Sequence, residues 1–331
     1  MRYAETWSEA RVRSVTGITP SIRLFEIEPA GATPTSFPLG GHINVAVLID
    51  GKPDTRSYSL IGAPGCYRIA VKLLPEGRGG SSYMWSLAPG ARLSVSNPST
   101  NFEVEYGRPD YLLVAGGIGI TPIYAMALAL LRHGARVRLA YAVRSRAELA
   151  FADELRAALG DRLTPFVSAE GQRLDLAVAL AGVAADGLAL VCGPLPMLDA
   201  AKRIWKGLGR PPSDLRFETF GSSGAHAPEP FRIRVPQLAH EIVVPENKSM
   251  LDALAEAGVA VISDCRRGEC GVCAVNVLAV DGVVDHRDVF FSDHQKQQNR
   301  KICVCVSRAT GTITIDPLFR PDQPRPAGSS G

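Results

Sequence analysis

Three closely spaced cysteines near the C-terminal end constrain this chain more than any other feature. Residues 265–273 read Cys-Arg-Arg-Gly-Glu-Cys-Gly-Val-Cys, a C-x4-C-x2-C spacing, and two further cysteines follow at Cys303 and Cys305. This is the plant-type pattern for a [2Fe–2S] cluster. Gly268 and Gly271 permit the sharp turns that a loop needs to wrap a cluster, and the amides freed by such turns can hydrogen-bond the sulfurs.

Two other uses of these cysteines fit the sequence less well. A zinc site usually pairs two C-x2-C units, and this chain has one. A disulfide framework is typical of secreted chains, and the N-terminus has no apolar signal core. Cys303 and Cys305 lie two apart on an extended run and share a face, so geometry leaves both as candidates for the fourth ligand.

Length and charge indicate the broad class of the protein. At 331 residues, the chain is too long for one typical core, so we expect two or three domains. The small formal net charge of +3 argues against a nucleic-acid partner. The longest apolar stretch, residues 123–131, is far short of a membrane span. We therefore expect a cytoplasmic protein with neither a nucleic-acid nor a membrane partner.

Residues 1–106 are rich in short strands. Segments 21–28 and 68–73 alternate polar and apolar residues, and 44–49 is an apolar run followed by the turn signal Asp50-Gly51. Short strands separated by frequent glycine and proline turns predict a small antiparallel barrel.

Two polar stretches of this barrel suit a cofactor. Arg56-Ser57-Tyr58-Ser59 combines a cation, hydroxyls and an aromatic ring, which together suit a phosphate and a planar ring. Gly77-Arg78-Gly79-Gly80-Ser81 supplies backbone amides, a hydroxyl and a positive charge for an anion. A solvated edge strand explains the first stretch equally well, and a flexible turn explains the second.

Residues 107–220 alternate strands and helices, which predicts a parallel sheet with its ligand at the carboxyl ends of the strands. The strand 111–115 runs into Gly116-Gly117-Ile118-Gly119-Ile120-Thr121-Pro122 and then an apolar helix. A glycine-rich turn before a helix suits a pyrophosphate, although this is not the G-x-G-x-x-G fingerprint. Cys192-Gly193-Pro194 follows another strand. The other expected elements are a strand over 138–143, helices near 151–155 and over 197–208, and a final strand over 216–220.

The C-terminal third is expected to contain a linker, a domain and a tail. Residues 221–230 form a linker by composition, residues 231–320 form the cluster-bearing domain, and residues 321–331 form a Pro-rich disordered tail. Expected elements of this domain are a hairpin of 231–235 with 241–244, a helix capped by Ser249 and ended by Gly258, and a last strand over 311–315.

Together, these stretches resemble the phthalate dioxygenase reductase family, and most of all its vanillate O-demethylase-type branch. The match rests on the motifs quoted above, on Phe217-Glu218-Thr219-Phe220 and on Cys305-Val306-Ser307-Arg308-Ala309, in the family's order. The resemblance implies a multidomain fold: a flavin-binding antiparallel β-barrel, an α/β nucleotide domain with a parallel sheet, and a C-terminal β-grasp ferredoxin of plant type.

The resemblance also implies roles for individual residues of the flavin site. Tyr58 would lie against the isoalloxazine ring of FMN, the flavin of this family, and Ser59 would lie near its reactive edge. Phe220 would shield the ring and move when the nicotinamide stacks. The residues implied for flavin binding are Arg56, Ser57, Tyr58, Ser59, Arg78, Gly79, Gly80, Ser81 and Phe220.

For the nicotinamide nucleotide, the resemblance implies that Thr121 faces the pyrophosphate and that Cys192 faces the nicotinamide. The implied catalytic set is Ser59, Cys192 and Phe220. The family prefers NADH, and Arg144-Ser145-Arg146 after a strand leaves NADPH open. The residues implied for NAD(P)H binding are Gly116, Gly117, Gly119, Thr121, Pro122, Cys192, Gly193 and Pro194. The implied cluster ligands are Cys265, Cys270, Cys273 and Cys305.

The implied function is a monomeric reductase that passes electrons from NADH through FMN and [2Fe–2S] to a Rieske-type oxygenase acting on an aromatic acid. The six histidines include no C-x-H pair for a Rieske centre, so oxygen chemistry belongs to the partner protein. A donor to a cytochrome P450 and a ferredoxin module with an inactive flavin half are the alternatives. We expect Arg266 and Arg267 to flank the exposed edge of the cluster. There they would raise the cluster potential, dock an acidic partner or simply form a solvated loop face.

Overall fold

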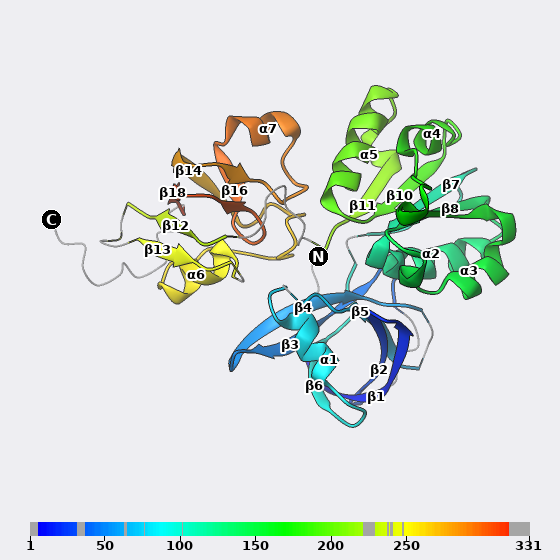
Figure 1. The fold of residues 1–331 in the computed structure, drawn as a ribbon, viewed down its shortest axis with the longest axis horizontal. Helices are drawn as coiled ribbons and strands as arrows, with labels where there is room; N and C mark the ends of the chain where they lie inside the picture. The colour runs from blue at the N-terminus through cyan, green and yellow to red at the C-terminus, as the bar shows by residue number, and fades with distance from the viewer. Residues whose placement is uncertain are drawn as a thin grey trace. The chain divides into compact units, whose positions relative to one another are not determined.

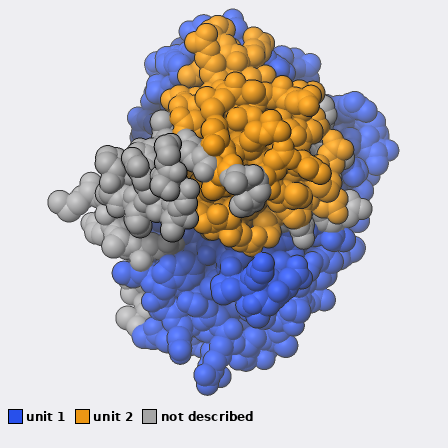
Figure 2. All heavy atoms as spheres, turned by 90° about the vertical axis from the view of Figure 1, so that its left-hand side faces the viewer, with its two compact units in different colours: residues 1–218 blue, residues 219–331 orange. Residues whose placement is uncertain are grey.

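The chain forms two compact units, Met1–Glu218 and Thr219–Gly331, which Figure 2 shows in different colours. The computed structural model describes residues 6–317 except residues 32–36, 63–64, 76, 101, 221–228, 237, 239–240 and 247. The predicted tail, and all of the predicted linker but its last two residues, lie outside the described residues. In the described part of the chain, no helix is long and apolar enough to span a membrane.

The first unit begins with a six-stranded antiparallel sheet. Its elements are β1 (Trp7–Thr19), β2 (Ile22–Pro29), β3 (His42–Ile49), β4 (Lys52–Ser59), β5 (Tyr67–Lys72), α1 (Gly80–Ser86) and β6 (Arg92–Ser96). The strand order is β4-β3-β6-β1-β2-β5, and the sheet curls on itself (Figure 1). An isolated antiparallel bridge between Leu60 and Ile69 joins the two edges of the sheet, and Phe25, Ile43 and Val95 are buried in its interior.

The predicted barrel strands are confirmed to within two residues. β2, β3 and β5 cover the segments 21–28, 44–49 and 68–73, although the burial of β2 does not alternate strictly, because the adjacent Leu24 and Phe25 are both buried. Ser57 to Ser59 are the last residues of β4, an edge strand of the sheet order. β1, the longest strand of the sheet, was not predicted as a separate element.

A five-stranded parallel sheet follows in the same unit. Its elements are β7 (Tyr111–Gly116), α2 (Ile120–Arg132), β8 (Val137–Val143), α3 (Ala152–Leu159), β9 (Leu163–Val167), α4 (Leu176–Ala181), β10 (Leu188–Cys192), α5 (Leu195–Gly207) and β11 (Leu215–Glu218). Short 3-10 turns are Gly117–Gly119, Arg146–Glu148, Gly160–Arg162, Ser168–Glu170 and Pro212–Asp214. The order β11-β10-β7-β8-β9 reverses direction between β7 and β10, so the ligand crevice is expected where these two strands end.

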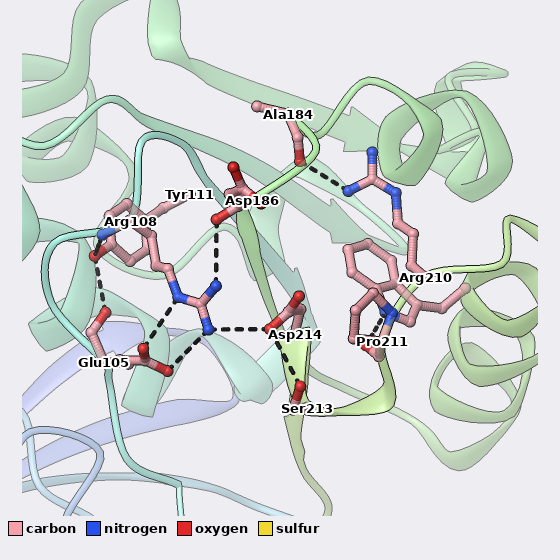
Figure 3. A network of polar contacts seen from close by, with 10 residues as sticks. Glu105, Arg108, Tyr111, Ala184, Asp186, Arg210, Pro211, Ser213 and Asp214 are labelled. Atoms are coloured by element: carbon pink, nitrogen blue, oxygen red, sulfur yellow. Dashed lines mark hydrogen bonds and ion pairs between the residues drawn. The ribbon is translucent and has the colours of Figure 1, made fainter.

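Polar contacts hold the segment that joins the two sheets against the parallel sheet. Arg108 donates to both carboxylate oxygens of Glu105, each at 3.1 Å, and to Asp214 at 3.0 Å, just before β11 (Figure 3). The hydroxyl of Tyr111 donates to the carbonyl of Glu105 at 2.8 Å. On the barrel side, Lys72 pairs with Glu148 at 2.8 Å. These contacts hold the barrel and the parallel sheet in one unit.

The second unit contains a mixed five-stranded sheet in the order β13-β12-β18-β14-β16 and a separate β15-β17 pair. Its elements are β12 (Phe231–Arg234), β13 (Ile242–Val244), α6 (Met250–Glu256), β14 (Ala274–Asp281), β15 (Val284–Asp285), α7 (Asp293–Gln298), β16 (Lys301–Cys303), β17 (Arg308–Ala309) and β18 (Thr312–Asp316). β12 pairs with β18 in parallel and with β13 as a hairpin. Met250, Leu254 and Ile313 are buried in the core that α6 and the sheet share.

The predicted start and end of α6 are confirmed. The hydroxyl of Ser249 accepts the N–H of Asp252 at 3.1 Å, as an N-cap does. Gly258 follows the helix with a φ of +79°, a left-handed conformation that favours glycine. The helix therefore ends just before the cysteine loop.

Candidate functional site

Two barrel motifs that are far apart in the sequence meet at Arg56. Its guanidinium donates to the carbonyls of Thr55 and Arg78, both at 2.9 Å, and pairs with Asp54 at 2.6 Å. A β-carbon on Gly80 would lie 2.5 Å from Arg56 Nε, so the guanidinium occupies the space that a larger residue at position 80 would fill. The end of β4 and the loop before α1 therefore form one corner, where Arg56 can bind an anionic group such as a phosphate.

Ser59 ends β4 as a buried residue that is 5% exposed. Among the described residues its hydroxyl has no hydrogen-bond partner, although buried hydroxyls normally have one. The preceding Tyr58 packs against the barrel core, and this burial raises the pKa of its hydroxyl despite the nearby Arg56 charge. A planar ring with polar edge atoms would supply the partner that Ser59 lacks, so these residues fit a flavin.

The remaining barrel residues predicted for the cofactor make contacts within the barrel. The hydroxyl of Ser57 donates to the side chain of Asn44, and that of Ser81 accepts the N–H of Leu74 at 3.0 Å. Gly79 has a φ of +74°, a conformation that other residues rarely adopt. Ser57 therefore connects β4 to β3, whereas Gly79 and Ser81 shape the loop at the start of α1.

The glycine loop and Cys192 lie against each other at the carboxyl ends of β7 and β10. A β-carbon on Gly119 would lie 2.2 Å from the carbonyl oxygen of Cys192. A β-carbon on Gly116 would lie 2.6 Å from Cδ of Pro194 and 3.2 Å from Cα of Gly193. Residues predicted for the nucleotide from two separate motifs are thus neighbours, at the point where open α/β sheets bind ligands.

The helix that follows the glycine loop presents its backbone to this crevice. α2 begins at Ile120 with no side-chain cap among the described residues, but the N–H of Ile120 donates to the carbonyl of Gly117 in the preceding turn. The amides that suit an anion here are therefore those of the glycine loop before the helix. Thr121 is buried, and its hydroxyl donates to the carbonyl of Ile118 at 3.0 Å. Pro122 lies in the first turn, where an N–H is not required. The pyrophosphate prediction therefore depends on backbone amides more than on the Thr121 side chain.

The cysteine loop directs three backbone amides at one sulfur. The N–H groups of Arg267, Glu269 and Cys270 each donate to Cys265 Sγ at 3.4 Å. Amides in this arrangement stabilise a metal-bound thiolate. The chain thus forms hydrogen bonds that a cluster sulfur ligand requires.

Both glycines of the loop have backbone conformations that explain their presence. Gly268 has a φ of +77°, and a β-carbon there would lie 2.9 Å from Cα of Asp288. Gly271 has a φ of +71°, and a β-carbon there would lie 2.3 Å from the ring of Phe290. The sharp turns predicted from the sequence are confirmed. Asp288, which the sequence did not single out, supports the turn at Gly268. Its carboxylate accepts the hydroxyl of Ser307 at 3.2 Å.

The cysteines make contacts in two groups. Cys270 hydrogen-bonds Cys265, whereas Cys303 and Cys305 both hydrogen-bond Cys273 and lower the pKa of its thiol to about 3. Cys305 also accepts a backbone hydrogen bond from the loop at position 268 and lies within electrostatic range of Cys265. Cys303 instead lies near the carboxylate at position 288. Cys305 is therefore better connected to the loop than Cys303.

This donor set fits a two-iron cluster rather than a single ion. In the ranges that the structure describes, no three His, Cys, Asp or Glu side chains converge as ligands of one metal ion. A [2Fe–2S] cluster takes two cysteines at each iron. Cys265 with Cys270, and Cys273 with either Cys303 or Cys305, match that requirement.

The prediction that both arginines flank an exposed edge is wrong for Arg267. Its side chain is only 8% exposed and pairs with Glu269 at 3.2 Å, because a carboxylate two residues away compensates the buried charge. Arg266 is 42% exposed and pairs with Asp252. The sequence alone did not indicate which arginine turns inward.

Glu269 is the functional candidate that the sequence did not indicate. Burial raises the pKa of its carboxyl, although Arg267 and the N–H of Thr219 oppose this effect. The N–H of Thr219 donates to Glu269 Oε1 at 3.1 Å. Phe220, the next residue, is partly exposed and belongs to the second unit.

Three domain families match separate parts of the chain. They are described as an oxidoreductase FAD-binding domain over residues 9–104, an oxidoreductase NAD-binding domain over 113–203 and a 2Fe-2S iron-sulfur cluster binding domain over 233–310. Each matched range lies inside one of the three domains expected from the sequence. The chain is therefore an oxidoreductase with flavin, nicotinamide and iron–sulfur domains.

Similarity to known proteins extends over almost the whole length. The chain is 36% identical to the phenoxybenzoate dioxygenase subunit beta of Ectopseudomonas oleovorans, over 92% of this chain and 96% of the relative. It is also 36% identical to the heme-dependent oxidative N-demethylase beta subunit of Ectopseudomonas mendocina (strain ymp), over 94% and 99%.

A solved structure shows the same domain combination. The chain is 31% identical to phthalate dioxygenase reductase, described as a modular structure for electron transfer from pyridine nucleotides to [2Fe–2S], over 94% of this chain and 98% of that one, with a TM-score of 0.74. The match covers the barrel, the parallel sheet and the cysteine-bearing unit together. The chain belongs to the phthalate dioxygenase reductase family.

Proposed function

We propose that this reductase uses NADH and FMN and delivers electrons from its cluster to a separate Rieske-type oxygenase that acts on an aromatic acid. The phenoxybenzoate dioxygenase relative supports an oxygenase partner with an aromatic carboxylate substrate. The relative from a heme-dependent N-demethylase supports the second candidate, a heme acceptor. We also propose that the protein is cytoplasmic and monomeric.

The flavin residues are proposed to act mainly by positioning. When bound, a flavin accepts a hydride and releases its two electrons singly, which connects a nicotinamide to a one-electron cluster. Arg56 and the loop 78–81 would bind the flavin phosphate, because the guanidinium and the loop amides lie in one corner. The Ser59 hydroxyl would hydrogen-bond the reactive edge of the ring, and Tyr58 would pack against its face.

The nucleotide residues would hold NADH at the crevice between β7 and β10. The amides of the glycine loop before α2 would bind the pyrophosphate. The close contact of Gly119 with Cys192 would let the nicotinamide approach the backbone at this point. Phe220 would cover the flavin ring in the resting protein and move aside when the nicotinamide stacks.

Two aromatic residues of α1 favour FMN over FAD. The guanidinium of Arg23 lies over the ring of Trp85, with Arg23 Cζ 4.1 Å from the centroid of that ring. Trp85 also donates its indole N–H to the carbonyl of Val71 at 3.0 Å. Tyr83 packs against the barrel core. Because both rings are used by the barrel, α1 offers no aromatic ring to stack on an adenine.

Arg146, in the short turn that follows β8, favours NADH over NADPH. Arg146 makes a bidentate pair with Glu170, with Nε 2.9 Å from Oε1. A carboxylate that holds this guanidinium would compete with, and repel, a 2′-phosphate. Arg144 and Ser145 directly precede Arg146 in the sequence. The proposed preference for NADH therefore depends on the carboxylate of Glu170, which pairs with Arg146.

The proposed cluster ligands are Cys265, Cys270, Cys273 and Cys305. The backbone hydrogen bond from position 268 to Cys305 supports this residue as the fourth ligand. Cys303, which is fully buried at the end of β16, would be a small apolar core residue.

The cysteine loop is the observation that carries the proposal. A flavin domain alone reduces small acceptors, whereas amides directed at a cysteine sulfur prepare a one-electron carrier. A carrier of single electrons suits a protein acceptor that is also reduced by one electron at a time. The cysteine loop therefore favours an oxygenase partner over the reduction of free small molecules.

Reconstitution with purified oxygenases tests the proposal. The purified chain, NADH and a panel of Rieske-type aromatic-acid oxygenases would be compared with the same mixture containing a heme N-demethylase or a cytochrome P450. NADH-dependent product formation with a Rieske oxygenase, at least tenfold faster than with the heme acceptors, is expected. Faster turnover with a heme acceptor would replace the proposed partner with the second candidate.

A further inference from the structure

A buried carboxylate packs against the cysteine loop of the second unit. Asp288 is 0% exposed, and a β-carbon on Gly268 would lie 2.9 Å from its Cα. The next residue, Val289, donates its N–H to the carbonyl of Gly268 at 3.0 Å. Residues 288–289 are therefore packed on the turn that separates the proposed ligands Cys265 and Cys270.

The same carboxylate is bound to the segment that follows Cys305. Ser307, which is also 0% exposed, donates its hydroxyl to Asp288 Oδ1 at 3.2 Å. The oxygen of this hydroxyl accepts the N–H of Arg287 at 3.1 Å. Asp288 thus connects the cysteine loop with the residues just after the proposed fourth ligand. All of these contacts are internal to the second unit.

The charge of Asp288 is only partly compensated by its neighbours. The nearby carboxylate of Asp285 pairs with the guanidinium of Arg287 at 2.7 Å, whereas that of Asp288 faces the ring of His286 at 3.4 Å. The ammonium of Lys296 donates to the backbone carbonyl of Asp288 at 2.5 Å. A charge in the protein interior acts strongly on the groups around it, because the interior screens it less than water does.

The Asp288 carboxyl is ionised at neutral pH, and its charge acts on the cysteines. Burial raises its pKa, but the hydrogen bonds with His286 and with the N–H of Phe291, at 2.9 Å, outweigh burial and hold the pKa below its ordinary value. The hydrogen bond to Cys273 and burial raise the pKa of the Cys303 thiol, and the charge of Asp288 raises it further. The carboxylate thus disfavours additional negative charge among the cysteines.

We propose that Asp288 is a positioning residue of the cluster site, whose carboxylate holds the cysteine loop against the segment after Cys305 and keeps the reduction potential of the cluster low. Reduction converts one ferric ion to a ferrous ion. The electron comes from the reduced flavin, which is oxidised and releases a proton to solvent. A buried carboxylate near the added electron makes this reduction less favourable.

This inference rests on the proposed function and deepens it. A low reduction potential makes the reduced cluster a stronger donor of single electrons, and the proposed function requires such a donor for a separate protein. The contacts of Asp288 therefore concern both the assembly of the cluster site and the driving force for electron delivery.

Three variants separate the charge of Asp288 from its hydrogen bonds. Asp288→Asn removes the charge at nearly constant size, and its single amide oxygen replaces two carboxylate oxygens that each accept a hydrogen bond. Ser307→Ala removes one of these hydrogen bonds and keeps the charge. Lys296→Met removes an ammonium that partly offsets the carboxylate. The matched control is Asp281→Asn, at the exposed last residue of β14.

Anaerobic titration of the full chain with dithionite gives the midpoint potential of the cluster, followed by the electron paramagnetic resonance signal of its reduced form. Asp288→Asn is expected to raise this potential by about 59 mV, the one-electron equivalent of a tenfold change in the reduction equilibrium. Lys296→Met is expected to lower it. Ser307→Ala and Asp281→Asn should have the wild-type potential.

The rate at which an iron chelator removes the cluster absorbance tests the holding role. This rate should be about fivefold higher in Asp288→Asn and Ser307→Ala, because each variant loses a buried hydrogen bond. It should be unchanged in Asp281→Asn. A wild-type rate in Ser307→Ala would contradict the holding role of the carboxylate.

An unchanged potential in Asp288→Asn would overturn the proposal, and so would an equal rise in Ser307→Ala, which would assign the effect to packing instead of charge. If Asp288→Asn holds no cluster, Lys296→Met decides, since a potential at or above the wild-type value in that variant contradicts the proposal. The titration uses neither NADH nor an oxygenase. Failure to reduce any Rieske oxygenase would therefore overturn the proposed function, while the potentials would still decide the role of Asp288.

Discussion

The backbone of Gly119 packs so closely on Cys192 that a β-carbon at position 119 would lie 2.2 Å from the Cys192 carbonyl oxygen. This contact joins the glycine loop after β7 to the motif after β10, two segments that are more than 70 residues apart in the sequence. It places both motifs at the reversal point of the sheet order. The predicted nucleotide site is therefore a feature of two neighbouring strand ends.

Gly119→Ala should separate these strand ends and weaken NADH binding. Overpacking against a backbone carbonyl costs roughly 1–3 kcal/mol, which predicts a KM for NADH about tenfold or more above wild type. Gly207→Ala is the control, because a β-carbon at the end of α5 meets nothing within 4 Å. Steady-state kinetics with ferricyanide as acceptor measures both variants. An unchanged KM in Gly119→Ala would contradict the proposed crevice.

Ser59→Ala should slow hydride transfer to the flavin. The Ser59 hydroxyl is buried without a partner among the described residues, and we propose that the flavin edge supplies it. Loss of one such hydrogen bond predicts a rate about tenfold lower. Ser86→Ala removes an exposed hydroxyl that donates to the carbonyl of Tyr83 and should react at the wild-type rate. Stopped-flow absorbance at the flavin band gives the rate, and equal rates in both variants would refute the role of Ser59.

Cys305→Ser should lose the cluster, whereas Cys303→Ser should keep it. Cys305 accepts the backbone hydrogen bond from the cluster loop, whereas Cys303 lies near the carboxylate of Asp288. Iron content and the visible absorbance of the purified variants report the outcome. Retention of the cluster in Cys305→Ser together with its loss in Cys303→Ser would reverse the assignment of the fourth ligand.

Wild-type protein should prefer NADH to NADPH by at least tenfold in kcat/KM, and Glu170→Gln should narrow this preference. Without the carboxylate charge, Arg146 can pair with a 2′-phosphate, and we expect about a threefold gain with NADPH, as is typical for exposed charge pairs. Glu103→Gln, at an exposed position of the connection after the barrel, is the control. A wild-type preference for NADPH would overturn the assignment of NADH.

Acid should weaken the contact between the barrel and the parallel sheet. The hydrogen bond from Lys72, followed by its charge, holds the pKa of Glu148 below its ordinary value against the opposing effect of burial. A carboxyl with a lowered folded-state pKa contributes stability above its unfolded pKa, about 4.3, and loses it as the pH falls through the folded value. The contribution is at most about 1 kcal/mol because the pair is partly exposed. Lys72→Met should lower the Tm at pH 7 more than at pH 3, and an equal effect at both values would contradict this account.

The elements best predicted from the sequence are those set by local pattern. The alternation of polar and apolar residues predicted β2 and β5. A capping serine predicted the start of α6, and the cysteine spacing predicted the cluster loop. Each of these signals lies within about ten residues of the chain, so a linear sequence contains it. β1 was missed because its 13 residues include the polar positions of a long strand with two irregularities in its pairing.

The contacts that could not be predicted join distant segments. Glu269 and Thr219 are 50 residues apart, and Arg108 and Asp214 are 106 apart. A charged residue in a sequence gives no sign of which distant partner it meets. For the same reason, the sequence placed both loop arginines at the surface, whereas Arg267 turns inward to a carboxylate two residues away.

The most direct test of the electron path is an anaerobic absorbance spectrum of the purified protein before and after addition of NADH. We expect flavin bands on top of broad iron–sulfur absorbance, with both bleached by NADH. A cluster spectrum without flavin, or a spectrum that responds to neither NADH nor NADPH, would contradict it and leave an electron-carrying ferredoxin module.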